Sequence, residues 1–146
     1  MKLRVVIDTN IWIRILLKGR VTLPILEAFN QDKFQLVISQ AMIEELHQVW
    51  NRPRLRQRID PGQATRLERQ LQYRAIWVEL QTIPPDCRDP KDLPVLATAI
   101  DGKADIIVSG DDDLRADDRL RAAMETYRIQ LLGVNSFLEY LDEGCK

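Results

Sequence analysis

The chain alternates between short apolar runs and longer stretches in which apolar residues recur every three or four positions. Short runs dominated by branched apolar residues predict buried strands. They cover residues 3–7, 34–38, 105–108 and 129–132. A fifth strand is predicted over residues 77–83, before the stop at Pro84-Pro85.

The stretches between these runs have the spacing of amphipathic helices. The predicted helices cover residues 11–16, 24–29, 39–50, 92–100 and 135–141. Pro53 ends the third of them, and an Arg-rich helical hairpin is expected at about residues 51–75, turning at Asp60-Pro61-Gly62. Strands that alternate with helices favour parallel pairing, so the predicted class is α/β, with a central parallel sheet and helices on both faces.

The 146 residues suit a single domain, residues 1–146, that is long enough to bury a core without disulfides. No apolar run approaches the ~20 residues of a membrane helix, so no membrane partner is expected. The early acid Asp8 argues against a signal peptide. Cys87 and Cys145 form no metal-spaced pair, and we expect a protein of the reducing cytoplasm.

The formal net charge of −1 conceals a separation of charge along the chain. Residues 51–75 contain seven Arg and two acids, whereas residues 86–118 contain ten Asp and four basic residues. A basic arm beside an acidic cluster is what a metal-dependent enzyme acting on a polyanion requires. Two solvated faces would give the same pattern, so charge alone leaves both interpretations open.

Three aspartates lie where a predicted strand ends or where a helix leads into one. Asp8 follows the first strand, Asp111 follows the strand over residues 105–108, and Asp92 opens a helix. Ligands of open parallel sheets bind beyond the carboxyl ends of the strands. Asp92 shares a helix face with apolar residues and is therefore expected to point toward the protein body. These apolar residues are Val95, Leu96 and Ala99. Asp8 and Asp92 also have a purely structural interpretation, as helix N-caps worth ~1 kcal/mol each.

The helix after Ser39 offers two adjacent acids, and periodicity favours one. Glu45 aligns with the apolar residues Met42 and Val49, whereas Glu44 lies on a mostly polar side. Glu45 is therefore predicted to turn inward, toward the strand ends. The alternative is a surface glutamate whose stem covers apolar neighbours.

Four carboxylates that converge on one site repel one another unless a cation lies between them. Oxygen ligands select hard cations, here Mg²⁺ or Mn²⁺. A zinc site is disfavoured, because His47 is the only histidine and no cysteine pair exists. A chain with one histidine also cannot carry out acid–base catalysis with two histidines. A Ser-His-Asp catalytic site would have His47 as its one candidate base. Attack of a metal-activated water on a phosphodiester is the leading chemistry.

Four segments, in their order and spacing, resemble a PIN domain. They are Val6-Ile7-Asp8-Thr9-Asn10, the helix from Ser39 to Val49 with Glu45-Leu46, Arg88-Asp89-Pro90-Lys91-Asp92 with Ala97-Thr98-Ala99, and Ala104-Asp105-Ile106-Ile107-Val108-Ser109-Gly110-Asp111-Asp112-Asp113-Leu114. With the closing segment 133–141 they are most similar to the branch of toxins from toxin–antitoxin pairs (VapC-like). Each segment alone is a weak signal, but the resemblance extends over essentially the whole chain.

The resemblance implies a PIN-like, Rossmann-like three-layer fold with strand order 3-2-1-4-5 and a Mg²⁺- or Mn²⁺-dependent ribonuclease. It places the catalytic acids at Asp8, Glu45, Asp92 and Asp111, and the metal ligands at Asp8, Asp92 and Asp111. The supporting positions are Thr9, Asn10, Ser109 and Asp113. Ser109 stands where the family more often has Thr, which keeps the hydroxyl. Asp89 is an alternative assignment for the third of these acids. The helix face and the register of Ala97-Thr98-Ala99 favour Asp92.

The implied reaction is hydrolysis of RNA to a 5′-phosphate and a 3′-hydroxyl, with Glu45 or Asp113 orienting the water. The implied partners are RNA, a cognate antitoxin protein and a second copy of the chain. Four arginines, called the Arg arm, are candidates to bind RNA phosphates, but antitoxin or dimer contacts would explain them equally. They are Arg52, Arg54, Arg56 and Arg58. Trp12, Leu16 and Leu17 are the expected exposed candidates for a homodimer contact.

Two further classes compete with the nuclease hypothesis. A PIN fold that only binds or scaffolds RNA would be marked by missing acids, and none is missing here. A phosphorylated receiver-like domain also clusters acids beyond its strands, but it needs a Lys after the last strand, where this chain has Gly133-Val134-Asn135. That design also has no place for the Arg-rich hairpin.

Overall fold

The computed structural model describes residues 2–85 and 90–144, apart from the side chains of residues 112, 113 and 144. At its centre is a parallel sheet of five strands in the order β3-β2-β1-β4-β5. The strands are β1 (Arg4–Ile7), β2 (Gln35–Ser39), β3 (Ile76–Val78), β4 (Ile106–Val108) and β5 (Gln130–Leu132). The predicted α/β class and the strand order 3-2-1-4-5 are confirmed.

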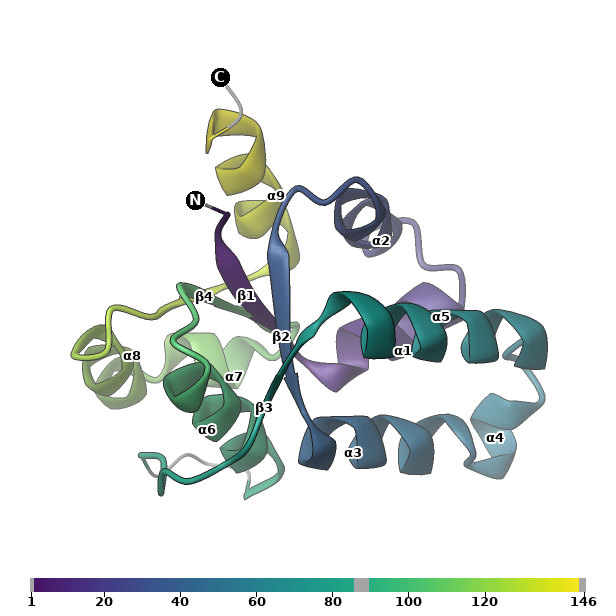
Figure 1. Ribbon diagram of the computed structural model, residues 1–146, viewed down its shortest axis with the longest axis horizontal. Helices are drawn as coiled ribbons and strands as arrows, with labels where there is room; N and C mark the ends of the chain where they lie inside the picture. Colours follow the sequence, from purple (N-terminus) through teal and green to yellow (C-terminus); the bar gives the residue numbers. More distant parts are fainter. Residues whose placement is uncertain (1, 86–89, 145–146) are drawn as a thin grey trace.

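Helices connect successive strands and cover both faces of the sheet (Figure 1). They are α1 (Thr9–Leu16), α2 (Leu23–Asn30), α3 (Gln40–Trp50), α4 (Pro53–Arg56), α5 (Pro61–Arg74), the 3₁₀ turn η1 (Pro90–Asp92), α6 (Leu93–Asp101), α7 (Asp112–Ala116), α8 (Asp118–Glu125) and α9 (Val134–Gly144). In Figure 1, α1, α2 and α5 lie on one side of the sheet and α6 and α8 on the other. The connections therefore change face between β1 and β4, which is the switch point where such sheets bind ligands.

The core is formed by the apolar central strands and the helix faces that cover them. Trp12 and Leu16 are only 1% and 4% exposed, and Leu17 is half-buried. The expectation that Trp12 and Leu16 are exposed dimer candidates is therefore wrong. The reason is that neighbouring helices enclose α1: α3 packs along it, and the Trp12 ring meets Phe29 of α2 edge-on at 5.8 Å between centroids.

The predicted strand over residues 77–83 is wrong beyond Val78, where β3 ends. The following chain is held by the Asp101 carboxylate at the end of α6, which accepts the backbone N–H groups of Gln81 at 2.7 Å and Thr82 at 3.1 Å. It also accepts the Thr82 hydroxyl. The Gln81 hydrogen bond, followed by that of the Thr82 side chain, holds the pKa of Asp101 below its ordinary value. The backbone of residues 81–82 is thus hydrogen-bonded to a side chain and not to a neighbouring strand.

Two helices between β4 and β5, α7 and α8, have no counterpart among the predicted elements. Asp117 is the N-cap of α8 and accepts the Leu120 N–H at 3.1 Å. Leu120 and Met124, one turn apart, are buried and anchor α8 beside β5. The cap and this apolar pair are the signals from which α8 could have been predicted.

The Arg-rich stretch folds as helices, but its longer helix pairs with α3. The element α4 is a single turn, and α5 begins at Pro61, where Asp60 accepts the Gly62 N–H at 2.9 Å. In Figure 1, α5 runs back alongside α3 in the opposite direction. His47 of α3 and Glu68 of α5 form an ion pair at 2.7 Å if the imidazole is protonated. The first leg of the hairpin is therefore α3, and α4 forms the corner.

Four helices in the described chain end with a non-glycine residue in the left-handed conformation. These residues are Lys18, Asp32, Lys103 and Arg128, with φ between 52° and 63°. After α1, for example, Lys18 N–H donates to the Ile15 carbonyl and Gly19 N–H to the Arg14 carbonyl, both at 2.9 Å. These two hydrogen bonds are those of a Schellman motif, which satisfies the last carbonyls of the helix.

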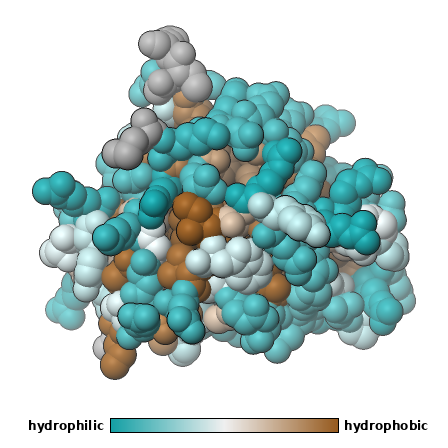
Figure 2. Space-filling model, viewed as in Figure 1, coloured by the Kyte–Doolittle hydropathy of each residue, from teal (hydrophilic) through white to brown (hydrophobic). Residues whose placement is uncertain are grey.

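The face seen in Figure 2 is largely hydrophilic, with apolar side chains gathered toward its middle and at one lower corner. Large apolar side chains that remain exposed in the described structure include Val21, Leu23, Tyr73, Trp77, Leu80, Ile83, Tyr127 and Tyr140. None of the described helices combines the length and apolarity that a membrane crossing requires.

Gly102, at the end of α6, packs tightly against the sheet, and we expect Gly102→Ala to destabilise the protein. A Cβ at this position would clash with Cγ1 of Val37 and lie 2.9 Å from the Thr98 carbonyl oxygen. Overpacking of this kind costs ~1–3 kcal/mol. Urea unfolding followed by circular dichroism measures the loss.

Gly62→Ala is the matched control, because a Cβ at Gly62 would meet only one carboxylate oxygen of Asp60, at 3.4 Å. We expect its free energy of unfolding to equal or slightly exceed that of the wild type. A Gly102→Ala variant as stable as Gly62→Ala would contradict the close approach.

Candidate active site

The parallel pairing of β1 and β4 brings two polar residues together at the carboxyl edge of the sheet. Ile7 is in register with Val108, so the next residues along each strand, Asp8 and Ser109, are neighbours. The Asp8 N–H donates to the Val108 carbonyl at 2.9 Å, and the Ser109 hydroxyl donates to Oδ2 of Asp8 at 3.4 Å. The switch point of the sheet therefore carries a carboxylate with a hydroxyl beside it.

Asp8 is a buried carboxylate, 5% exposed, and it also caps a helix. Its Oδ1 accepts the Asn10 N–H at 3.4 Å and the Thr9 hydroxyl at 3.5 Å. The structural and functional interpretations of this residue are thus compatible, because one oxygen caps α1 while the other faces Ser109.

Burial raises the pKa of Asp8 above its ordinary value near 3.8. Hydrogen bonds from Asn10, Ser109 and Thr9 oppose the shift, and the negative charge of Asp111 adds to it. Desolvation and a like charge both disfavour the ionised carboxylate. A cation between Asp8 and Asp111 would relieve both costs.

Asp111 is placed by the turn that follows β4. Its N–H donates to the Ser109 hydroxyl oxygen at 3.0 Å, and its Oδ1 accepts the Leu114 N–H at 3.4 Å. The Ser109 hydroxyl thus contacts both Asp8 and the backbone of Asp111. This link explains why a hydroxyl residue at position 109 matters to the spacing of the two acids.

Glu45 and Asp92 lie half-buried on the elements that border this edge. Glu45 is on α3, beside Glu44, which is exposed and accepts a hydrogen bond from Gln40 at 3.3 Å. Asp92 is the N-cap residue of α6, but its side chain makes no capping hydrogen bond. The helix α6 packs against β1, β2 and α3. The capping interpretation therefore does not account for the Asp92 side chain.

The structure brings Asp8 and Asp111 together without assembling all four predicted acids into a metal-binding group. Among the described residues, no set of three or more His, Cys, Asp or Glu side chains is arranged to hold a metal ion. Asp89 and the side chain of Asp113 lie outside the described part of the structure. The chemistry of the donors still fits a hard cation, because Asp8, Asp111 and the neighbouring Ser109 offer only oxygen.

A pair of buried hydroxyls behind this edge was not predicted as part of the site. The Thr98 hydroxyl oxygen lies 2.7 Å from Oγ of Ser39 and 2.6 Å from the Pro94 carbonyl. Both side chains are fully buried, and Ser39 makes no side-chain capping bond to α3. Ser39 follows β2 as Asp8 follows β1, and this position is the signal that could have identified it. The pair joins α6 to the end of β2.

A cation at the site, Arg14, also escaped prediction. Its guanidinium packs on Gly110, where a Cβ would lie 2.7 Å from Nη1 and 3.2 Å from Cζ of Arg14. Arg14 is exposed and stands one helical turn after Asn10 on α1. The position of Arg14 relative to Asn10 is the sequence signal that could have drawn attention to it.

The other basic residues singled out from the sequence lie elsewhere. The Arg arm side chains are exposed on and around the short helix α4. The single histidine, His47, contacts Glu68 at 2.7 Å and the Trp50 ring at 4.9 Å between centroids. These contacts give His47 a structural role between α3 and α5.

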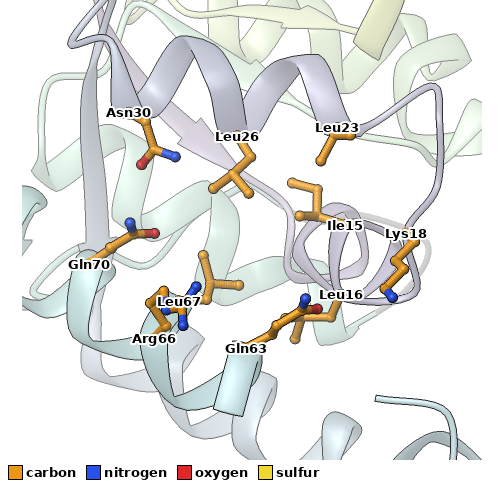
Figure 3. Close-up of a pocket in the computed structure, with 10 residues that line it drawn as sticks. All are labelled: Ile15, Leu16, Lys18, Leu23, Leu26, Asn30, Gln63, Arg66, Leu67 and Gln70. Atoms are coloured by element: carbon orange, nitrogen blue, oxygen red, sulfur yellow. The ribbon is translucent and has the colours of Figure 1, made fainter. Parts of the chain in front are cut away.

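A pocket of about 350 Å³ lies between α1, α2 and α5 and contains none of the predicted acids (Figure 3). Its floor is apolar, and its rim carries amide and basic side chains. The lining residues are Ile15, Leu16, Lys18, Leu23, Leu26, Asn30, Gln63, Arg66, Leu67 and Gln70. The pocket therefore lies outside the acidic edge and offers a separate surface with a basic rim.

Comparison with known protein families identifies the family of the chain. Residues 4–113 match the model of the PIN domain, a span that includes Asp8, Glu45, Asp92 and Asp111. No curated protein shows significant similarity to the chain.

We expect Asp8→Asn to raise the melting temperature at pH 7. Asn retains an oxygen that can cap α1 but removes a charge that burial and Asp111 disfavour. Since the folded pKa of Asp8 lies above the unfolded value near 3.8, the penalty is absent below that pH and grows as the pH rises from the unfolded toward the folded pKa. Each ~1 kcal/mol gained corresponds to roughly 3 °C in a chain of this size.

Thermal unfolding at pH 3.5 and pH 7 measures the effect, with Asp8→Ala as the control that loses both charge and cap. The wild type and Asp8→Asn are expected to converge at the lower pH, and Asp8→Ala to be less stable than Asp8→Asn. A wild type more stable than Asp8→Asn at pH 7 would contradict the assigned direction of the Asp8 pKa.

Proposed function

Because the chain belongs to the PIN domain family, whose members are generally nucleases, we propose that it is a Mg²⁺- or Mn²⁺-dependent endoribonuclease. The observation that carries the proposal is the buried Asp8 carboxylate beside Asp111, at the point where the sheet changes the face of its connections. Two ionised carboxylates this close repel each other unless a cation lies between them, and with a cation they form part of a metal site.

The proposed roles follow the resemblance of the sequence segments and the contacts of Asp8, Ser109 and Asp111. Asp8, Asp92 and Asp111 would hold the cation, which when bound lowers the pKa of a water molecule and neutralises the scissile phosphate. Ser109 keeps Asp8 and Asp111 at a set spacing through its hydroxyl. Glu45, the less exposed of the two acids on α3, orients the attacking water. The products are a 5′-phosphate and a 3′-hydroxyl.

We further propose that the enzyme is the toxin of a toxin–antitoxin pair and works in the cytoplasm. The support is the resemblance of the four sequence segments, together with the pocket between α1, α2 and α5 (Figure 3). Its apolar floor and the basic rim residues Lys18 and Arg66 suit an acidic antitoxin segment with an apolar anchor. A second copy of the chain is the other proposed protein partner. Light scattering of the purified protein tests for the homodimer, and light scattering with the product of a neighbouring gene tests for the antitoxin complex.

Cleavage of single-stranded RNA should require both the metal and the acids. We expect wild-type protein to cleave with Mn²⁺ or Mg²⁺ and to lose activity in EDTA. Asp8→Asn, Asp92→Asn and Asp111→Asn should each reduce the rate by at least ~10²-fold, because each removes a charge that holds the cation. Gel analysis of a labelled RNA measures the rate, and circular dichroism checks the fold.

Glu44→Gln is the matched control for Glu45→Gln on the same helix. We expect Glu44→Gln to cleave at the wild-type rate, because the side chain is exposed and bonded to Gln40. Glu45→Gln should be slow. Full activity of Asp8→Asn in a preparation free of wild-type enzyme would overturn the nuclease proposal and favour an RNA-binding scaffold.

The Arg arm is proposed to bind RNA phosphates that flank the cut. Replacing Arg54 and Arg56 with Gln should weaken RNA binding across sequences and flatten its dependence on salt by ~0.7 log units per lost contact. Turnover at saturating RNA should change little, since these charges stabilise ground and transition states alike. Fluorescence anisotropy over a series of salt concentrations measures the slope. An unchanged slope with a loosened oligomer or antitoxin complex would assign the arm to a protein interface.

A further inference from the structure

The guanidinium of Arg14 stands at the acidic edge of the sheet. It packs on Gly110, with Nη1 2.7 Å from the position of a Cβ there. Gly110 lies between Ser109, which hydrogen-bonds Asp8, and Asp111, whose N–H donates to Ser109. The positive charge of Arg14 thus lies against the turn that joins Ser109, the hydrogen-bond partner of Asp8, to Asp111.

Arg14 does not neutralise these acids. In the described part of the structure its side chain makes no hydrogen bond or ion pair within 4.0 Å, and Asp111 is the charged residue that influences the pKa of Asp8. The side chain is exposed, and an ion pair at such a position would contribute little to stability. Its guanidinium donors therefore remain available to a ligand.

A cation held beside metal-binding acids, but not paired with them, is suited to an anion that lies between the two. The phosphodiester of RNA is such an anion in the proposed reaction. Guanidinium binds two phosphate oxygens at once through its planar fork, which the point charge of a lysine does not do. Gly110 provides the space, because any larger residue would displace the guanidinium from this place.

We propose that Arg14 is a further catalytic residue that binds the scissile phosphate of RNA opposite the acid pair. This inference rests on the proposed ribonuclease function and deepens it. Arg14 is distinct from the Arg arm, because it comes from α1 at the strand ends, whereas the arm surrounds α4. It would contribute to the reaction step itself, whereas the Arg arm contributes only to binding.

Two measurements on Arg14→Gln test the proposal. In EDTA, where no cleavage occurs, anisotropy of a labelled single-stranded RNA should show a salt slope lower by ~0.7 log units, the loss of one phosphate contact. With Mn²⁺, kcat should fall ~10²-fold, as expected when a donor to developing charge is removed. The melting temperature should stay at the wild-type value, because the side chain makes no bond in the described structure.

Arg14→Lys and Arg119→Gln are the matched controls. Lysine should restore the salt slope but only part of kcat, because it keeps the charge without the fork. Arg119 is exposed on α8, and its replacement should change neither quantity.

If the wild type cleaves RNA and Arg14→Gln has the same salt slope and kcat, the assignment of Arg14 is overturned while the ribonuclease proposal stands. Arg14 would then be a candidate for contact with a protein partner. A wild type that neither binds nor cleaves RNA would overturn the ribonuclease proposal, and the Arg14 proposal with it.

Discussion

The register between β1 and β4 is the constraint on which the candidate site depends. The pairing of Ile7 with Val108 places Asp8 beside Ser109, and Ser109 then holds the backbone of Asp111. Asp8 precedes Ser109 by 101 positions in the chain, yet a one-residue slip of β1 against β4 would point Asp8 to the opposite face. The site is therefore a property of the sheet, and the buried apolar strands maintain it.

Tight packing of α6 against the sheet supports the same edge from behind. Gly102 lets the end of α6 meet Val37 of β2, and the Thr98–Ser39 hydroxyl pair joins the helix to the end of that strand. Asp92 stands at the start of α6, so the position of the helix also determines that of the acid. Burying two hydroxyls costs free energy unless they bond to each other, as they do here. The Thr98–Ser39 hydrogen bond thus favours one position of α6 on the sheet over others.

Sequence patterns predicted the fold where local periodicity and tertiary burial agree. The apolar central strands, which are buried on both faces, and the inward side of α3 are such cases. Trp12 was misplaced because only the tertiary structure shows that α2 and α3 cover the apolar side of α1. The strand at residues 77–83 was overextended, because the pattern could not show that Asp101 would bind Gln81 and Thr82. The spacing of Arg14 from Asn10 could have drawn attention to it, but only the tertiary structure shows that it packs on Gly110.

The left-handed residues that end four helices have a practical consequence for protein engineering. Lys18, Asp32, Lys103 and Arg128 each carry a side chain in a conformation that costs roughly 1 kcal/mol more than glycine would. All four lie at helix ends, outside the acid pair and the Arg arm. Glycine at Asp32, Lys103 or Arg128 is therefore expected to stabilise the fold, whereas Lys18 also lines the pocket between α1, α2 and α5. Variants of buried acids that express poorly can be studied in such a stabilised background without altering the chemistry.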